Sequence, residues 1–258
     1  VLNNAPTLND QTFSVAENSA AGTSVGSIAA SDPDSGTNGA LSFTVVGGNG
    51  QSLFNVSTSG DITVTSAAAL NRESTSRYQL DVQVTDGGNP GLTDTATITI
   101  DLSDVNESPK LIGQSFSIAE NSVAGKSVGT ITAIDRDSGA NGTLSFSVTG
   151  GSGQSLFDVS TTGVITVASG ASLNFESTSS YQLDVQVTDG GTPTLSDTAT
   201  ITINLNDLNE TPTVNDQTFS IDENLVAGTS VGTIAASDPD SGRNGGAGFT
   251  VTGGSGQS

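Results

Sequence analysis

The sequence predicts an all-β protein made of tandem seven-stranded Greek-key β-sandwiches joined end to end. Three observations support this fold class. Apolar residues alternate with polar ones at a spacing of two, as in half-buried strands, and the spacing of an amphipathic helix is missing. Clusters of glycine, proline, asparagine and aspartate separate the alternating segments. The pattern also returns every 103 residues, which indicates a repeated domain.

The strands of the first copy follow from its apolar positions. Phe13 and Val15 begin the series, and Tyr78 opens one of the two longest strands, so Tyr78 and its equivalent Tyr181 are expected in the core. The stretch around Val25 and Ile28 breaks the alternation and is expected to carry a bulge. Short alternating strands separated by turns favour antiparallel pairing in a sandwich. The seven expected strands centre on residues 13–15, 25–28, 41–45, 54–56, 62–64, 78–84 and 96–102.

The repeat divides the chain into residues 1–106, 107–209 and a truncated third copy, 210–258. Each full copy is long enough to bury its own core. A short link that contains Pro109 follows the last strand of the first copy, so we expect consecutive copies to form a rod with little freedom. The third copy carries only the first few strands. Its apolar face is therefore expected to be uncovered, with partial disorder or a borrowed partner.

Composition excludes several classes of function. The chain has no cysteine, histidine, methionine or tryptophan, which excludes disulfides, soft-metal sites and catalytic groups that need histidine or cysteine. Six basic residues against 27 acidic ones give a net charge of −21, which argues against nucleic acid and against an anionic membrane as partners. The apolar runs are too short to cross a bilayer, so no direct membrane insertion is expected.

The copies of the repeat carry acidic residues at the same positions. Glu17-Asn18 returns as Glu120-Asn121 and as Glu223-Asn224. The Asp-x-Asp element of residues 32–34 returns at 135–137 and at 238–240, and Asp86-Gly87 returns as Asp189-Gly190. One such element by itself is usually a turn or a solvated loop. Their joint recurrence at fixed offsets indicates a shared task, and clustered oxygens are the ligands that calcium requires.

These carboxylates are expected to meet where one sandwich follows the next. Glu17 follows the first strand, Glu73 lies in a loop, and Asp104 and Glu107 lie in the link. Two carboxylates at about 4 Å repel by roughly 4 kcal/mol at an effective dielectric constant near 20. Such a cluster therefore needs cations, and two or three divalent ions would nearly neutralise it. Calcium bound there is expected to stiffen the junction.

The recurring acidic elements resemble those of a known family. Cadherin domains carry an "xEN" element, an "LDRE" element, a "DxNDNxP" linker, a "DxD…NG" loop and a "DxG" turn, which bind calcium between consecutive domains. The chain has five matching stretches in this order, which are Ala16–Asn18, Leu70–Glu73, Asp104–Pro109, Asp135–Gly142 and Asp189-Gly190. The resemblance implies an Ig-like, cadherin-type sandwich over the whole chain.

The resemblance also implies which residues bind calcium. At the first junction the ions nearer the first repeat would be held by Glu17, Glu73, Asp104 and Glu107, and the ion nearer the second repeat by Asn106, Asp135, Asp137, Asp189 and the carbonyl of Asn141. At the second junction the equivalent ligands are Glu120, Glu176, Asp207, Asn209, Glu210, Asp238, Asp240 and Asn244. At the start of the chain, Asn3, Asn4, Asp32, Asp34, Asn38 and Asp86 occupy the same positions without a preceding repeat.

Three departures from the family pattern affect these expectations. Asn71 and Asn174 replace the aspartate of the "LDRE" element, and the linker has glutamate where the family has its second aspartate. The number of ions per junction, two or three, therefore stays open. The chain also lacks the tryptophan with which animal junctional cadherins adhere. Arg72 and Arg136 have no basic counterpart in the other copies, so no role is assigned to them.

The expected function is that of a calcium-binding repeat region of an extracellular or cell-surface protein. Such a region would support calcium-dependent adhesion to other surface proteins, to glycans or to the same protein on another cell. The similar copies, the richness in serine, threonine and glycine and the lack of cysteine resemble cadherin-like arrays of bacterial surface adhesins. The alternative is a carbohydrate-binding module, although both tyrosines are expected in the core. An enzyme, such as a glycosidase with paired carboxylates, is not expected.

Overall fold

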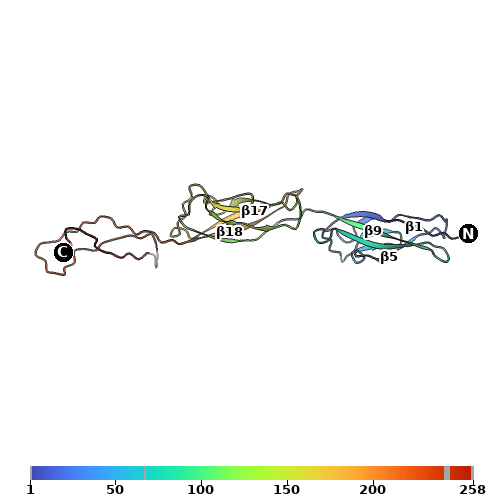
Figure 1. Cartoon of the computed structure of the whole chain (residues 1–258), viewed down its shortest axis with the longest axis horizontal. Helices are drawn as coiled ribbons and strands as arrows, with labels where there is room; N and C mark the ends of the chain where they lie inside the picture. The colour runs from blue at the N-terminus through green and yellow to red at the C-terminus, as the bar shows by residue number, and fades with distance from the viewer. Residues whose placement is uncertain (1, 67, 241–244, 257–258) are drawn as a thin grey trace. The chain divides into compact units, whose positions relative to one another are not determined.

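The structure is a computed structural model that describes residues 2–66, 68–240 and 245–256. Every secondary-structure element of these residues is a β-strand (Figure 1). Contacts divide the chain into two compact units. Unit 1 comprises Val1–Ser108, Asp135–Thr143 and Asp189–Leu195, and unit 2 comprises Pro109–Ile134, Leu144–Thr188 and Ser196–Ser258. The repeat boundaries at residues 106 and 209 stay predictions, because compact contact units and sequence repeats are different divisions of the chain.

Unit 1 contains a four-stranded sheet, a three-stranded sheet and a short two-stranded ladder. The four-stranded sheet has the order β2 (Gln11–Ala16), β9 (Thr93–Ser103), β8 (Arg77–Thr85), β5 (Ser42–Gly47). The three-stranded sheet has the order β3 (Ser24–Ser27), β7 (Asp61–Val64), β6 (Phe54–Val56), and the ladder pairs β1 (Thr7–Leu8) with β4 (Ala30–Ser31). All seven expected strands are present. The alternation did not predict the two-residue strands β1 and β4, because they are shorter than one full alternation.

The first long strand pairs in a direction that the sequence analysis did not predict. β2 runs parallel to β9, with Gln11 opposite Ile98, whereas the other pairings in unit 1 are antiparallel. Antiparallel pairing is dictated only where a tight hairpin joins two strands. Because most of the repeat lies between β2 and β9, no hairpin constrains them, and the expectation of purely antiparallel pairing was wrong here.

The expected bulge of the weak strand is confirmed. The register of β3 against β7 shifts between Ser24 and Gly26. A side chain at Gly26 would overlap the ring of Phe13, and the equivalent Gly129 lies against Phe116 in the same way. Glycine at this position therefore lets an aromatic residue of the first long strand lie directly on the backbone of the bulged strand.

The core of unit 1 lies between its two larger sheets. Inward-facing side chains of β8 and β9 meet those of β6 and β7, and Leu80, Ile98 and Ile62 are fully buried. Tyr78 packs against this core, with its ring 5.8 Å from that of Phe54 at an interplanar angle of 61°. This edge-to-face contact confirms the core position expected for Tyr78.

Unit 2 repeats the same arrangement. Its sheets have the orders β11–β18–β17–β14, β12–β16–β15 and β10–β13. β11 is again parallel to β18, and Tyr181 lies edge-to-face on Phe157 at 6.0 Å. The strand bounds are β10 (Lys110–Leu111), β11 (Ser115–Ala119), β12 (Ser127–Thr130), β13 (Ala133–Ile134), β14 (Ser145–Gly150), β15 (Phe157–Val159), β16 (Val164–Val167), β17 (Ser180–Thr188) and β18 (Ser196–Asn206).

The third copy does not form a sandwich within the described residues. One isolated bridge joins Thr213 to Ser237, and no strand is assigned after β18 in the described part of the chain. Apolar side chains such as Phe219 and Ile221 are exposed. Their exposure confirms the uncovered apolar face that the sequence predicts for half a repeat, and the borrowed partner stays a prediction.

A cavity-creating substitution tests the core. We expect Ile98→Ala to lower the free energy of unfolding by about 2–5 kcal/mol, because it empties a fully buried site between the sheets. The matched control is Val46→Ala, whose side chain is 58% exposed and which should change stability by no more than about 0.5 kcal/mol. Calorimetric unfolding measures both variants, and equal losses would contradict the described core.

Candidate metal centre

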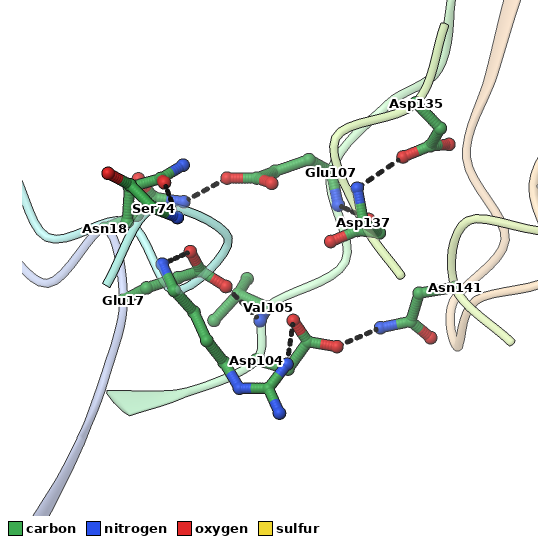
Figure 2. Close-up of polar contacts among 11 residues, drawn as sticks. Glu17, Asn18, Ser74, Asp104, Val105, Glu107, Asp135, Asp137 and Asn141 are labelled. Carbon is green, nitrogen blue, oxygen red and sulfur yellow. Dashed lines mark hydrogen bonds and ion pairs between the residues drawn. The ribbon is translucent and has the colours of Figure 1, made fainter. Parts of the chain in front are cut away.

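Five carboxylates of unit 1 converge where several loops meet. Glu17 follows β2, Glu73 lies in the loop before β8, Asp104 and Glu107 follow β9, and Asp137 belongs to the segment 135–143. They form two groups in which ligand oxygens lie within 4.8 Å of one another. The outer triplet is Glu17, Glu73 and Asp104, and the inner triplet is Glu73, Glu107 and Asp137. We call these five residues the first carboxylate cluster, of which Figure 2 labels Glu17, Asp104, Glu107 and Asp137.

Backbone amides hold Glu17 in place. Its side chain is 1% exposed, and its Oε2 and Oε1 accept hydrogen bonds from the amides of Arg72 (2.7 Å) and Val105 (2.9 Å). The next residue, Asn18, has a left-handed backbone with φ of 55°, and its amide donates to the carbonyl of Leu70. Asparagine tolerates this conformation better than most residues. The recurring Glu-Asn pair is therefore a turn that aims the glutamate inward.

Asn18 also contacts the cluster directly, which the sequence analysis missed. Its Nδ2 donates to Glu107 Oε1 at 2.6 Å, and the backbone amide of Glu107 donates to Asp137 Oδ2 at 2.7 Å (Figure 2). The amide of Asp137 donates in turn to Asp135 Oδ1 at 2.9 Å. The recurrence of asparagine after each of these glutamates was the signal that could have identified Asn18.

A second set of predicted ligands lies beside the cluster and is joined by amide groups. Asn106 Nδ2 donates to Asp189 Oδ2 and to the carbonyl of Pro193, both at 2.9 Å. Asp189 Oδ1 accepts the amides of Gly191 and Leu195. Burial raises the pKa of Asp189, but these hydrogen bonds together outweigh burial, so that its pKa is lowered. The structure thus brings Asn106 and Asp189 together as the resemblance implies.

Asn141 contributes a contact other than the expected one. Its side-chain Nδ2 donates to Asp104 Oδ2 at 3.0 Å (Figure 2). The resemblance assigned its carbonyl to the ion nearer the second repeat. The side-chain contact places residue 141 beside the outer triplet, and the carbonyl role stays a prediction.

Five buried acceptor oxygens in and beside this cluster lack a hydrogen-bond donor among the described residues. They are Asp104 Oδ1, Asn106 Oδ1, Glu107 Oε2, Asp135 Oδ2 and Asp137 Oδ1. A buried acceptor without a donor costs about 1–3 kcal/mol. Hard cations take just such carboxylate and amide oxygens, and calcium takes six to eight of them. The donor set and the free oxygens therefore fit calcium.

Repulsion and burial raise two pKa values in the cluster. Burial raises the pKa of Glu73, and repulsion by Glu17 and Glu107 adds to the rise. Burial likewise raises the pKa of Asp137, helped by repulsion from Asp135. Each raised pKa means that the charged form is disfavoured without a cation.

A second carboxylate cluster in unit 2 has the same construction. Glu120 is 1% exposed and accepts the amides of Phe175 (2.7 Å) and Leu208 (2.8 Å). Asn121 Nδ2 donates to Glu210 Oε1 at 2.8 Å. The cluster again consists of two triplets with ligand oxygens within 4.8 Å of one another, which are Glu120, Glu176 and Asp207, and Glu176, Glu210 and Asp240.

The other predicted ligands of the second cluster are placed less completely. The amide of Asp240 donates to Asp238 Oδ1 at 3.1 Å, as Asp137 does to Asp135. Asn209 is exposed and donates to the carbonyl of Glu210. Asn244 lies outside the described residues.

The predicted ligands at the start of the chain repeat the hydrogen bonds that Asn106, Glu107 and Asp137 make in and beside the first cluster. Asn3 Nδ2 donates to Asp86 Oδ2 at 3.0 Å, and the amide of Asn4 donates to Asp34 Oδ2 at 2.7 Å. The amide of Asp34 donates to Asp32 Oδ1. Within the described ranges, Asp32, Asp34 and Asp86 belong to no triplet with oxygens within 4.8 Å. These three residues therefore stay predicted ligands.

Two residues of the 70–73 segment make contacts that the sequence analysis did not anticipate. Asn71 Oδ1 accepts the amide of Ser74 at 2.7 Å, so it closes a local turn. Arg72 was assigned no role because Phe175 stands at its place in the second copy. The structure shows a contact there, because Arg72 Nη1 lies 3.2 Å from Asp104 Oδ1 and forms an ion pair with a residue of the outer triplet.

The sequence profile of the cadherin domain matches residues 11–103 and 114–206. The chain is 36% identical to human (Homo sapiens) protocadherin Fat 4 over 245 residues, which is 92% of this chain and 5% of that protein. It is 32% identical to rat (Rattus norvegicus) cadherin-8 over 248 residues, which is 88% of this chain and 30% of that protein. The chain thus spans a small part of these relatives.

Solved structures give the same result. The structure of mouse cadherin-23 EC22-24 superposes with a TM-score of 0.75 at 25% identity, covering 94% of this chain and 80% of that one. Protocadherin gammaB7 EC3-6 gives a TM-score of 0.72 at 28% identity, covering 93% and 62%. These similarities confirm the predicted all-β sandwich fold. The relatives named are animal proteins, so they give no support to the narrower interpretation as a bacterial adhesin. Among the described residues, no helix is long and apolar enough to cross a membrane.

The raised and lowered pKa values predict how stability depends on pH without metal. A carboxyl group with a raised folded-state pKa contributes stability that is fully present below its unfolded pKa, 4.5 for Glu73 and 3.8 for Asp137. This contribution is lost as the pH rises through the folded-state pKa. In EDTA we therefore expect the unfolding temperature to rise as the pH is lowered from 7 to about 5.

The lowered pKa values act in the opposite direction at lower pH. Hydrogen bonds lower the pKa of Asp86 and Asp189 despite burial, so their contribution is present above 3.8 and is lost as the pH falls through the folded-state values. Below about pH 4 the unfolding temperature should fall again. Calorimetry across this range is the measurement, and a steady decrease on going from pH 7 to 5 would contradict the strained carboxylates.

Proposed function

The chain belongs to the cadherin family, and from this premise we propose that it is part of the extracellular region of a cell-surface protein in which calcium supports adhesion. Since cadherins are adhesion proteins, no enzymatic activity is assigned to the chain. The single observation that carries the proposal is the set of buried acceptor oxygens without donors, gathered among carboxylates that the backbone holds in place.

The residues suggest how calcium would be held. Glu73 belongs to both triplets of the first cluster, so its carboxylate can serve two neighbouring ions, and Glu176 has the same place in the second cluster. Asn106, Asp135 and Asp189 offer further oxygens for a third ion. We therefore propose three ions in the first cluster. Calcium supplies positive charge there and accepts the oxygens that lack donors.

A bound ion would act on the linker. Asp104 and Glu107 lie in the linker itself, whereas Glu17 and Glu73 belong to loops of the first repeat and Asp137 to a loop of the second. Oxygens that bind a common ion can no longer move independently. Calcium is therefore proposed to restrain the linker. This restraint would produce the stiffened rod expected from the sequence.

The candidate partners of this region are molecules of the cell surface. One of the solved structures similar to this chain, protocadherin gammaB7 EC3-6, is described as a cis-dimer. A second copy of the chain is thus one candidate, beside other surface proteins and glycans. The adhesive mechanism that uses tryptophan is not proposed, because the chain has none. No specific observation favours the carbohydrate-binding alternative, and both tyrosines pack against buried phenylalanines.

Metal-dependent unfolding tests the proposal. We expect about 5 mM calcium to stabilise the protein by roughly 1–2 kcal/mol per ion relative to EDTA, as for sites with a Kd of about 10⁻⁴–10⁻³ M. Magnesium at the same concentration should stabilise far less, because it requires small octahedral sites and keeps its water. Equal unfolding temperatures in EDTA, calcium and magnesium would sink the proposal.

Removing the shared carboxylate gives a sharper test. We expect Glu73→Gln to abolish most of the calcium stabilisation of unit 1, since Glu73 serves both triplets. In EDTA the same variant should be as stable as the wild type or more so, because the pKa of Glu73 is raised. Asp158→Asn is the matched control, since Asp158 is exposed on β15 and its equivalent in the first copy is Asn55. A loss of stability in both media would indicate damage to the fold instead.

A further inference from the structure

The outer triplet of the first cluster has an internal cation beside it. Arg72 Nη1 lies 3.2 Å from Asp104 Oδ1, an oxygen that accepts no hydrogen bond from the described residues. The other oxygen of Asp104 accepts the amide of Asn141 at 3.0 Å. The pair is held by charge, without the alignment of a hydrogen bond. One of the three carboxylates that would bind an outer ion is thus already partly neutralised.

The backbone of residue 72 has a role separate from that of its side chain. The amide of Arg72 donates to Glu17 Oε2 at 2.7 Å, and the amide of Phe175 makes the same contact with Glu120 Oε2 at 2.7 Å. The Phe175 side chain packs against the core of unit 2. The turn that holds the buried glutamate is therefore indifferent to the side chain, and the guanidinium is an addition of the first copy.

The side chain of Arg72 is partly exposed, so it can move from Asp104 into solvent. It is 37% exposed, so water reaches it, whereas the side chain of Asp104 is 27% exposed and its Oδ1 is buried. An ion pair of this kind contributes about 1 kcal/mol at most. A divalent ion bound to Asp104 would lie close to the guanidinium and repel it, since two positive charges would share one carboxylate.

We propose that Arg72 is a displaceable internal counter-ion that sets the calcium affinity of the outer triplet. Without calcium, its guanidinium reduces the repulsion among Glu17, Glu73 and Asp104. When calcium enters, the guanidinium leaves Asp104 for solvent, so that binding is an exchange of one cation for another. The first cluster therefore binds its outer ion more weakly than its carboxylates alone would. This inference rests on the proposed function.

The proposal predicts effects of opposite sign for one substitution. We expect Arg72→Gln to bind the outer calcium about 5- to 10-fold more tightly than the wild type, because nothing has to be displaced. The same variant should unfold at a lower temperature in EDTA, because the carboxylates lose their counter-ion. A residue that merely supported the fold would weaken both calcium binding and stability when it is replaced.

Calcium titration calorimetry on the whole chain, together with unfolding in EDTA, makes the measurement. Arg72→Lys keeps the charge and should bind calcium like the wild type. Arg72→Phe copies the residue that the second copy carries on the same backbone, and it should behave like Arg72→Gln. Arg77→Gln is the matched control, because Arg77 has a 63% exposed side chain that pairs with Asp101 at 2.6 Å, and its replacement should leave calcium affinity unchanged. In the wild type, the Nε–H resonance of Arg72 should shift when calcium is added.

The outcomes separate this inference from the proposed function. Tighter binding by Arg72→Gln and Arg72→Phe, with Arg77→Gln unchanged, supports the exchange. Unchanged or weaker binding by both Arg72 variants, in a wild type that binds calcium, overturns the inference alone. A wild-type chain that binds no calcium overturns the inference and the proposed function together.

Discussion

Backbone amides that point at buried glutamates are the constraint on which the site depends. Glu17 and Glu120 each accept two such amides, from a loop and from the linker. A buried carboxylate would otherwise be costly, and these hydrogen bonds make it tolerable without any metal. The other carboxylates of the first cluster lie around this anchored glutamate. The sandwich supplies the rigidity, since the loops leave the ends of paired strands.

The site therefore lowers the stability of the folded protein when no metal is bound. Glu73 and Asp137 have raised pKa values, and several buried oxygens lack donors within the described part of the chain. Ordinary surfaces avoid both conditions, because each lowers stability without compensation. Their coincidence at one place is expected where a ligand absent from the bare chain completes the structure. Arg72 offsets part of this strain with a charge of its own.

Much of the fold and of the site could be predicted from the sequence, because the residues that determine both recur at regular spacings. Alternating apolar residues predicted the long strands, and carboxylates at fixed offsets predicted the residues that meet in the two clusters. Recurrence, however, reveals only what all copies share. Arg72 lies at a position where the copies differ, so comparison between copies removed it from consideration. Asn18 recurs, but its left-handed backbone and its bond to Glu107 depend on tertiary structure.

The remaining differences also have physical causes. The parallel pairing of β2 with β9 joins strands separated by most of a repeat, and local sequence does not encode such a direction. The side-chain bond from Asn141 to Asp104 required knowledge of which atoms of residue 141 face the linker. Pattern and spacing thus located the residues of the site, whereas their individual hydrogen bonds depend on the tertiary structure.

The arrangement of the clusters has a consequence for how such genes can grow. Each cluster combines carboxylates that lie on both sides of a linker, such as Glu73 and Asp137. Duplication or deletion of a whole 103-residue period keeps these partners in register. A single copy inserted elsewhere would bring only half of each of two clusters. Selection would therefore favour recombination in units of the period, and an array can lengthen or shorten while every interior linker stays complete.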